Sequence, residues 1–222
     1  MAFGDVLRTS ASPDASPWGI GGDGSTIWHS NPSANTLYEL SPSDFSTVQS
    51  ATPPGAGPID IGGDSDTVWH TDDDSGTVYE LASSDLSTVR SSSSPNSFPD
   101  GIGGDADTIW LSQNYDPLYH ELSTSDFSSI QSASTPTDSP IGAGGNTEIA
   151  YHSEFDTGTL YELSTSDFSV VNDASAPGGQ PYGIGGDRNT VWVTDRTNDE
   201  LYEVEEPPEL PAAPTNLSAT LQ

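Results

Sequence analysis

The chain lacks cysteine and lysine altogether, and it has few positive charges of any kind. Without cysteine there is no disulfide, no Cys-ligated zinc and no thiol nucleophile. Lysine and arginine together number 4 against 34 aspartates and glutamates, which gives a formal net charge of −30. Because a polyanion repels nucleic-acid phosphates and anionic lipid headgroups, we expect neither nucleic acid nor a membrane surface among the partners.

Long apolar runs are missing as well. No stretch of ~18 apolar residues occurs, so we expect no insertion into a bilayer. The first residues lack the basic and apolar regions of a signal peptide, which predicts a cytoplasmic protein, or one assembled in the cytoplasm and later released, as a virion is. Leu, Ile, Val and Phe make up only about 18% of the chain, a share that is typical of disorder at this net charge.

An internal repeat argues against disorder, because three kinds of residue recur in steps of 41 positions through five cycles. Glycine pairs begin at Gly21, Gly62, Gly103, Gly144 and Gly185. An aromatic residue follows at Trp28, Trp69, Trp110, Tyr151 and Trp192. A glutamate follows at Glu39, Glu80, Glu121, Glu162 and Glu203. The chain therefore consists of five equivalent units.

Each unit reads as four short strands separated by turn-forming residues. In the first unit these strands are residues 18–22, 26–30, 36–40 and 45–51, and Gly, Asp, Asn, Ser and Pro lie between them. No segment has a sustained period of 3.6 residues, so helices are not expected. Four-stranded units at a period of about 40 residues predict an all-β fold, a five-bladed β-propeller, with the glycine pair on the innermost strand.

The two ends of the repeat region predict how the ring closes. The fifth unit has three strands, at residues 182–186, 190–194 and 200–204, and then runs into acidic residues and prolines. Residues 4–10 correspond to the missing fourth strand when the repeat is extended backwards. We therefore predict a propeller over residues 1–206, in which the N-terminal strand completes the last blade and removes its open edge.

The repeat motif resembles that of a known group of propellers. The motif is Pro-x-Gly-Ile-Gly-Gly-Asp at residues 17–23, Thr-Ile-Trp at 26–28 and Leu-Tyr-Glu-Leu at 37–40. It resembles the NHL and SMP-30-like propellers over roughly residues 17–204, a likeness that implies the fold, since these folds host enzymes, lectins and scaffolds alike. Residues 207–213 have the composition of a Pro-rich linker. Residues 214–222 resemble the start of a fibronectin type III domain.

Charge and modular organisation lead to a functional expectation. The acid excess without lysine resembles proteins of haloarchaea and their viruses, and the tail resembles the modules of fibres. We expect a structural or recognition module of a halophilic virion, a tail fibre or capsid-surface protein, at the virion surface or otherwise extracellular, with the cytoplasm as the alternative. Its expected partners are other virion or surface-fibre subunits and a host cell-surface glycan or protein.

Two other function classes stay open. A lectin-like carbohydrate-binding propeller would have several equivalent sugar sites. A lactonase- or glycosidase-like enzyme would have one asymmetric acidic pocket with a divalent ion. Since catalysis normally breaks symmetry and the blades are nearly identical, we expect that the protein is not an enzyme.

The candidate binding residues lie in the loops that differ most between blades. These loops, between the second and third strands and between one blade and the next, open on the same face of a propeller, where function usually sits. The candidates are Asp72, Asp73, Asp74, Tyr115, Asp116, Phe155, Asp156 and Arg196. The loop aromatics could stack on a sugar or anchor a partner, or they could fold back onto their own blades.

Carboxylates also follow the first strand of most units. Asp23, Asp64, Asp105 and Asp187, with Asn146 in the fourth unit, could converge near the axis and hold Ca²⁺ or Mg²⁺. Alternatively, each caps its own turn. No other cofactor is expected. The repeated Glu39 is interpreted as part of a hydrogen bond between blades or as lying on a wet outer edge. Histidines recur on the second strand at His29, His70 and His152 and could ligate a metal, but Leu111 and Val193 at the equivalent positions favour blade packing.

The charge generates a first testable prediction. At ~1 M salt the Debye length is about 3 Å, so that the mutual repulsion of the acidic residues is largely screened. We expect the circular-dichroism signal of the β-structure to develop fully only in molar salt. Complete β-structure in dilute buffer would contradict this expectation.

Overall fold

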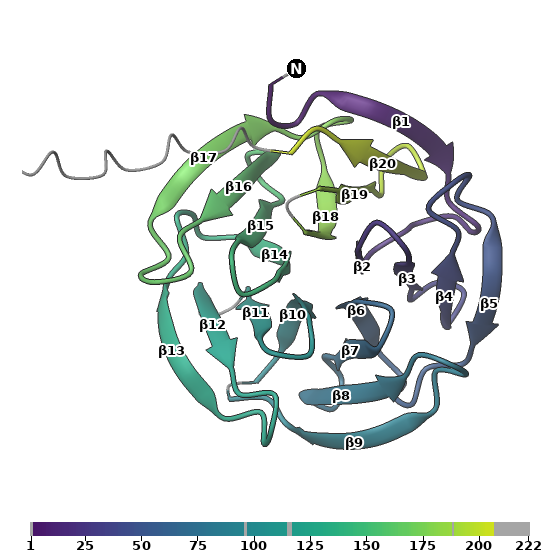
Figure 1. Ribbon diagram of the computed structural model, residues 1–222, viewed down its shortest axis with the longest axis vertical. Helices are drawn as coiled ribbons and strands as arrows, with labels where there is room; N and C mark the ends of the chain where they lie inside the picture. The colour runs from purple at the N-terminus through teal and green to yellow at the C-terminus, as the bar shows by residue number, and fades with distance from the viewer. Residues whose placement is uncertain (1, 96, 115–116, 188, 207–222) are drawn as a thin grey trace, which may run out of the picture.

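The computed structural model of the protein describes residues 2–95, 97–114, 117–187 and 189–206. Its strands form five sheets of four antiparallel strands, and the sheets stand side by side around a central axis (Figure 1). The predicted all-β fold, a five-bladed β-propeller, is therefore confirmed. The predicted linker at 207–213 and the predicted fibronectin-like start at 214–222 lie outside the described residues.

In the first four blades the strands run outward from the axis in chain order. The first blade consists of β2 (Ile20–Gly22), β3 (Ile27–Asn31), β4 (Thr36–Leu40) and β5 (Thr47–Ala51). The second consists of β6 (Pro58–Gly63), β7 (Thr67–Asp72), β8 (Thr77–Ala82) and β9 (Thr88–Ser93). The third consists of β10 (Pro99–Gly104), β11 (Ile109–Gln113), β12 (Leu118–Leu122) and β13 (Ser129–Ser134). The fourth consists of β14 (Pro140–Gly145), β15 (Ala150–Glu154), β16 (Thr159–Leu163) and β17 (Val170–Ser175).

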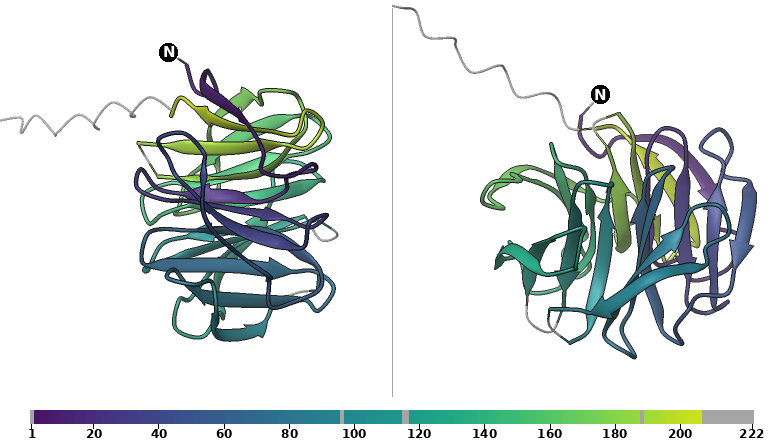
Figure 2. Two further views of the ribbon diagram at one scale, coloured as in Figure 1. Left: turned by 90° about the vertical axis from the view of Figure 1, so that its right-hand side faces the viewer. Right: turned by 60° about the horizontal axis from the view of Figure 1, so that its bottom comes forward.

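The fifth blade is built from both ends of the described chain. It contains β18 (Pro181–Gly186), β19 (Val191–Asp195) and β20 (Glu200–Val204), and β1 (Val6–Ala11) pairs antiparallel with the outer side of β20. Thr9 lies opposite Tyr202 in this pairing. Figure 2 shows β1 beside the last strand in both further views. The predicted closure by the N-terminal strand is thus present, and it covers an edge that would otherwise be open.

The inner strands approach one another so closely that only glycine fits between them. A Cβ atom on Gly21 would lie 2.7 Å from the Cα of Gly62, and one on Gly103 would lie 2.8 Å from the Cα of Gly144. Carbon atoms in van der Waals contact are about 3.5–4.0 Å apart. The middle of the axis is accordingly lined by glycines alone, which confirms their predicted place on the innermost strand.

Buried aromatic side chains join each blade to the next. The indole Nε1 of Trp69 donates a hydrogen bond to the backbone oxygen of Asp105 in the following blade, at 3.1 Å. The ring of Phe127, also from that blade, packs edge-on against Trp69 with centroids 5.9 Å apart. Equivalent bonds recur in the first, third and fourth blades, while Nε1 of Trp192 in the fifth has no partner among the described residues. The hydrophobic clusters lie between neighbouring blades. Each blade therefore depends on its neighbours for a core.

The fourth strand of the first blade begins later than predicted. Residue 45 was expected to open that strand, but Phe45 has a φ of 59° and its N–H donates to the oxygen of Ser41, which ends a tight turn. Its ring is buried against Trp192 of the fifth blade at 5.6 Å. The packing of the aromatic ring outweighs the cost of a left-handed backbone at a non-glycine residue.

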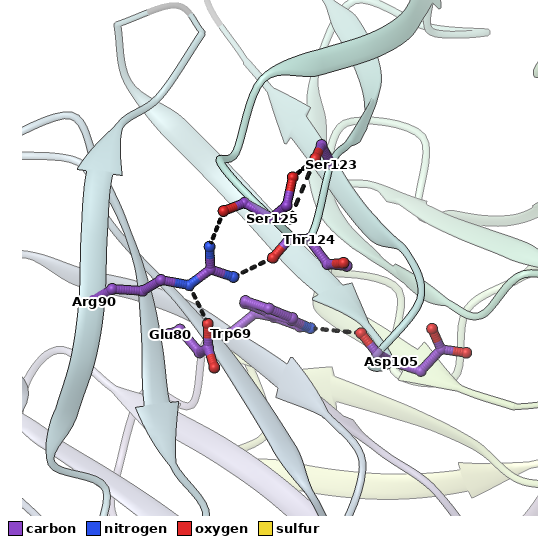
Figure 3. A network of polar contacts seen from close by, with 7 residues as sticks. All are labelled: Trp69, Glu80, Arg90, Asp105, Ser123, Thr124 and Ser125. Atoms are coloured by element: carbon purple, nitrogen blue, oxygen red, sulfur yellow. Dashed lines mark hydrogen bonds and ion pairs between the residues drawn. The ribbon is translucent and has the colours of Figure 1, made fainter.

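Polar side chains on the outer strands also link neighbouring blades through hydrogen bonds. Arg90 pairs with Glu80 of its own blade and donates to the backbone oxygens of Thr124 and Ser125 in the next blade (Figure 3). In the first blade Gln49 does the same, donating both to Glu39 and to the oxygen of Ser83. Glu39 and Glu80 thus bond within their own blades, and the link to the next blade runs through the partner side chain on the fourth strand.

Among the described residues, no helix is long and apolar enough to cross a membrane.

The close approach at the axis generates a stability prediction. In Gly103→Ala the new methyl group would collide with backbone on the neighbouring inner strand, so we expect a loss of about 1–3 kcal/mol in the free energy of unfolding, measured by urea denaturation. Gly24→Ala is the matched control, because a Cβ there would meet only a Thr190 methyl group at 3.9 Å. Equal stabilities of the two variants would contradict the role of the inner glycines.

Candidate functional site

The axis has a different environment at each of its two ends. At the end where the inner strands begin there is a small pocket, called the axial pocket below, with a cavity volume of about 10 Å³, room for about one water molecule. It is lined by Trp18, Gly19, Ile59, Asp60, Asp100, Ile141 and Tyr182. At the end where the inner strands finish there is a larger hollow of about 200 Å³ around the predicted metal ligands. The glycine-lined middle lies between the two.

The axial pocket breaks the symmetry of the ring. Its outer level consists of one residue from each blade at positions 41 residues apart, and these five positions carry four different residue types. They are Trp18, Ile59, Asp100, Ile141 and Tyr182. At the next level inward, four blades contribute glycine and the second contributes Asp60. The near-identical blades therefore enclose a single asymmetric acidic pocket.

Asp60 forms the floor of this pocket and is almost completely buried, with 2% of its surface exposed. Its Oδ1 accepts the backbone N–H of Ile61 at 2.8 Å, and its Oδ2 accepts that of Ile102 at 2.9 Å. Burial raises the pKa of Asp60 well above its usual range, against the opposing effect of these N–H donors. A Cβ on Gly19 would lie 2.1 Å from Oδ1, so the floor has room for only one carboxyl group.

Asp100 lies half-buried in the wall of the axial pocket. Its Oδ2 accepts the backbone N–H of Asn114 at 2.9 Å. Burial raises the pKa of Asp100 to about 7, and the nearby charge of Asp73 adds to this effect. Burial also raises the pKa of Asp73 itself. A carboxyl group with a pKa near 7 exists in both protonation states at neutral pH, which is the condition for efficient general acid–base catalysis.

The opposite wall is aromatic and carries a cation. The rings of Trp18 and Tyr182 lie 4.9 Å apart. The guanidinium of Arg196 lies over both rings, 4.9 Å from the Trp18 centroid and 5.0 Å from that of Tyr182. It donates a hydrogen bond to the Tyr182 hydroxyl at 2.7 Å. Phe155 packs edge-on against Tyr182 at 5.0 Å, which extends this wall outward.

The predicted binding residues are divided between the pocket and the surrounding loops. Phe155, Arg196 and Asp73 contact or influence pocket residues, as described above. Asp72 is buried and caps its own loop, where Oδ1 accepts the N–H of Ser75, while Asp74 is exposed. Asp156 accepts a hydrogen bond from the Ser139 hydroxyl. The candidates Tyr115 and Asp116 lie outside the described residues.

The predicted metal ligands surround the hollow at the other end of the axis. Oδ1 of Asp23 accepts the backbone N–H groups of Ser25 and Thr26, both at 2.8 Å, and the same turn recurs at the equivalent positions. The turn-cap interpretation thus describes these side chains. In the part of the chain that the structure describes, no group of three or more His, Asp or Glu side chains is placed to hold a metal ion. Binding of Ca²⁺ or Mg²⁺ there stays a prediction.

The repeated histidines are packing residues inside the blades. Nδ1 of His29 lies 2.7 Å from the oxygen of Gly19, and Nδ1 of His152 lies 3.2 Å from that of Gly142. The ring of His152 stacks on Tyr161 at 5.8 Å. Burial lowers the pKa of His29, His70 and His152 to about 4. These histidines are therefore neutral in the folded protein at neutral pH.

Four residues of the axial pocket were not among the predicted sites: Trp18, Asp60, Asp100 and Tyr182. The predicted sites lay in the loops, because the inner-strand segments are nearly the same in every repeat. Comparing the five repeats column by column would have found the pocket, since the positions of Trp18 and Asp60 are the two in this segment where the chemistry changes between blades.

The fold and the axial pocket define the protein as a five-bladed β-propeller. No protein-family model and no curated protein matches the chain. Among solved structures it is similar to glutaminyl cyclase from Myxococcus xanthus, with 13% identity, a TM-score of 0.73 and coverage of 90% of this chain and 94% of that one. It is also similar to virginiamycin B lyase from Staphylococcus aureus in two structures, one with quinupristin. Both have 19% identity and cover 87% of this chain and 67% of that one, with TM-scores of 0.52 and 0.54.

These matches overturn two expectations. The expectation of a virion structural or recognition module was wrong, because the similar structures are propeller enzymes and none points to a virion role. The expectation that the protein is not an enzyme was wrong for the same reason. The lectin-like alternative required equivalent sites, whereas the five equivalent positions in the wall of the axial pocket carry tryptophan, isoleucine, aspartate, isoleucine and tyrosine. The near-identity of the blade sequences had been used as an argument against a single asymmetric site, but the residues that meet at the axis differ between blades.

The buried histidines generate a prediction about pH. With a pKa of 6.5 in the unfolded chain and about 4 in the folded one, His152 is protonated first in the unfolded chain as the pH falls. It therefore lowers the free energy of unfolding by up to about 1.4 kcal/mol per pH unit between these values. His152→Leu copies Leu111 at the equivalent position of the third blade. We expect its stability to fall less steeply than that of the unaltered protein from pH 6.5 to 4.

Chemical denaturation across this pH range measures the effect. The raised pKa values of Asp60 and Asp100 act in the opposite direction, because these groups bind protons first in the folded state. Both proteins contain them, so their effect cancels in the difference. Parallel pH profiles for the two proteins would contradict the assignment of a neutral, buried His152.

Proposed function

We propose that the protein is an enzyme that transfers protons in the axial pocket, with Asp100 as the general acid and base. The observation that carries this proposal is the pKa of about 7 at Asp100, in a pocket whose other wall positions carry tryptophan, isoleucine or tyrosine. A strongly shifted carboxyl group in a concave, asymmetric site is a sign of catalysis, with burial and a neighbouring charge as the physical cause.

The walls of the pocket favour a small substrate that carries an amine. Asp73, together with Asp100 when that carboxyl group is ionised, gives one side negative potential, which attracts an ammonium group and holds it near the proton acceptor. The faces of Trp18 and Tyr182 favour cations and apolar groups. The pocket has room for about one water molecule, so it admits the amine end of a substrate and leaves the rest of the molecule outside.

The reaction we propose to test first is the cyclisation of an N-terminal glutamine, the activity that the Myxococcus xanthus protein's name states. In this reaction the α-amine attacks the side-chain amide carbonyl, a new C–N bond forms in the ring, and the old C–N bond breaks to release ammonia. One proton must leave the amine and one must reach the departing ammonia. Asp100 can do both in sequence, because its carboxylate accepts the first proton and returns it.

The test compares two charge-matched variants in the third blade. Asp100→Asn cannot exchange the proton, and we expect kcat/KM for ammonia release from a glutaminyl peptide to fall about 10²- to 10⁴-fold. Asp107→Asn, on an exposed turn that follows the inner strand, should leave the rate unchanged. In the unaltered protein kcat/KM should rise as the pH increases through about 7, because Asp100 acts first as a base.

Full activity in Asp100→Asn would refute the assignment of Asp100. No ammonia release by the unaltered protein, in dilute or in molar salt, would refute glutaminyl cyclisation as the reaction. A screen of other amine-bearing substrates would then test whether Asp100 catalyses a different reaction in the same pocket.

The composition, the repeat motif and the C-terminal residues support further parts of the proposal. We propose that this enzyme works in concentrated salt, on the support of its net charge of −30 and its lack of lysine. Its NHL and SMP-30-like repeat motif supports a propeller that carries its site on the axis. The fibronectin-like residues at 214–222 support a modular protein in which this propeller is one unit.

A further inference from the structure

The three arginines that the structure describes differ in how fully the protein itself uses them. Arg8 uses Nε, Nη1 and Nη2 on Glu203 and on two backbone oxygens of the first blade. Arg90 uses the same three nitrogens in the equivalent way. Arg196 donates a single hydrogen bond, to a neutral hydroxyl. No carboxylate among the described residues forms an ion pair with it.

Arg196 is held in place despite having no anionic partner. Its guanidinium lies over the rings of Trp18 and Tyr182 at 4.9 and 5.0 Å, and Phe155 supports Tyr182 from the side. A guanidinium has five N–H donors in a fixed plane, so most of its donors remain available. Such a fork matches a carboxylate, which it can bind through two parallel hydrogen bonds.

An arginine without a carboxylate partner is unusual in a chain this acidic. In a chain with 34 acidic residues and 4 basic ones, an arginine has many potential carboxylate partners. Arg8 and Arg90 each form an ion pair with a glutamate, while Arg196 lies against two residues of the axial pocket. Across this pocket is Asp100. Arg196 borders the aromatic wall of the pocket without lining it, and the carboxyl groups lie on the opposite, acidic side.

We propose that Arg196 binds the carboxylate of a zwitterionic substrate whose amine faces Asp100. The ligand class is a small α-amino acid or a short peptide with a free carboxyl end. The amine half of this inference rests on the proposed function. The carboxylate half rests on the geometry of Arg196 alone, so that the two can be tested separately.

The test measures binding of unreactive ligands by calorimetry with the full chain. Glycine and glycyl-glycine are zwitterions, and glycinamide and glycyl-glycinamide are their counterparts without the carboxylate. We expect at least one zwitterion to bind about tenfold more tightly than its amide, the effect of one charge-assisted hydrogen bond. The preferred length distinguishes an amino acid from a peptide. General attraction to a polyanion would give the opposite order, since the amides carry a net positive charge.

Two variants with the same change in net charge locate the effect. Arg196→Gln should lose the preference for the zwitterion. Arg90→Gln should keep it, and the fold tolerates this change because Gln49 and Gln131 occupy the equivalent positions of other blades. Equal binding of zwitterion and amide by the unaltered protein, absence of binding, or a preference retained in Arg196→Gln would overturn the proposal.

Turnover of glutaminyl peptides is measured separately. Ammonia release without a preference for a free carboxylate would support the proposed function and refute the role of Arg196. Zwitterion binding that depends on Arg196, without ammonia release, would support the carboxylate site and refute glutaminyl cyclisation.

Discussion

The structure depends on the contact between glycine backbones at the axis. Each inner strand lies so close to the next that a methyl group on Gly21 or Gly103 would overlap the neighbouring backbone. This spacing brings the blades near enough for Trp69 to reach the backbone of the following blade and for Phe127 to pack on Trp69. The low aliphatic content is sufficient because these few large side chains are shared between blades, and each therefore contributes to two units of the ring.

The same constraint explains how a symmetric scaffold acquires an asymmetric site. Five equivalent strands converge on one point, and the space there admits no more than one carboxyl group, so at most one blade can carry an aspartate at this level. Asp60 is that aspartate, and it places a buried acid under Asp100. Around it, five positions that are equivalent in the repeat meet in one small volume. Substitutions in separate blades, far apart along the chain, thus become neighbours and form a pocket with an acidic side and an aromatic side.

Much of the fold could be predicted from the sequence, and little of the site could. A period that recurs without insertion determines the number of blades, and the unmatched strand at residues 4–10 indicates the closure. Residue 45 was expected to open a strand, whereas tertiary packing against Trp192 holds Phe45 in a left-handed turn. Asp100 was overlooked for a physical reason: its pKa depends on burial and on the charge of Asp73, and both arise only when the blades meet.

The way the ring closes also bears on how such proteins change over generations. The seam between β1 and β20 lies inside a blade, and β1 occupies the place of a fourth strand like that of every other blade. Duplication or loss of one 41-residue segment by unequal recombination would leave both seam strands intact. The number of blades could therefore vary in descendants of this gene while the pairing of β1 with β20 stayed the same. The axial residues would be redistributed at each event, which offers new combinations of side chains around one unchanged closure.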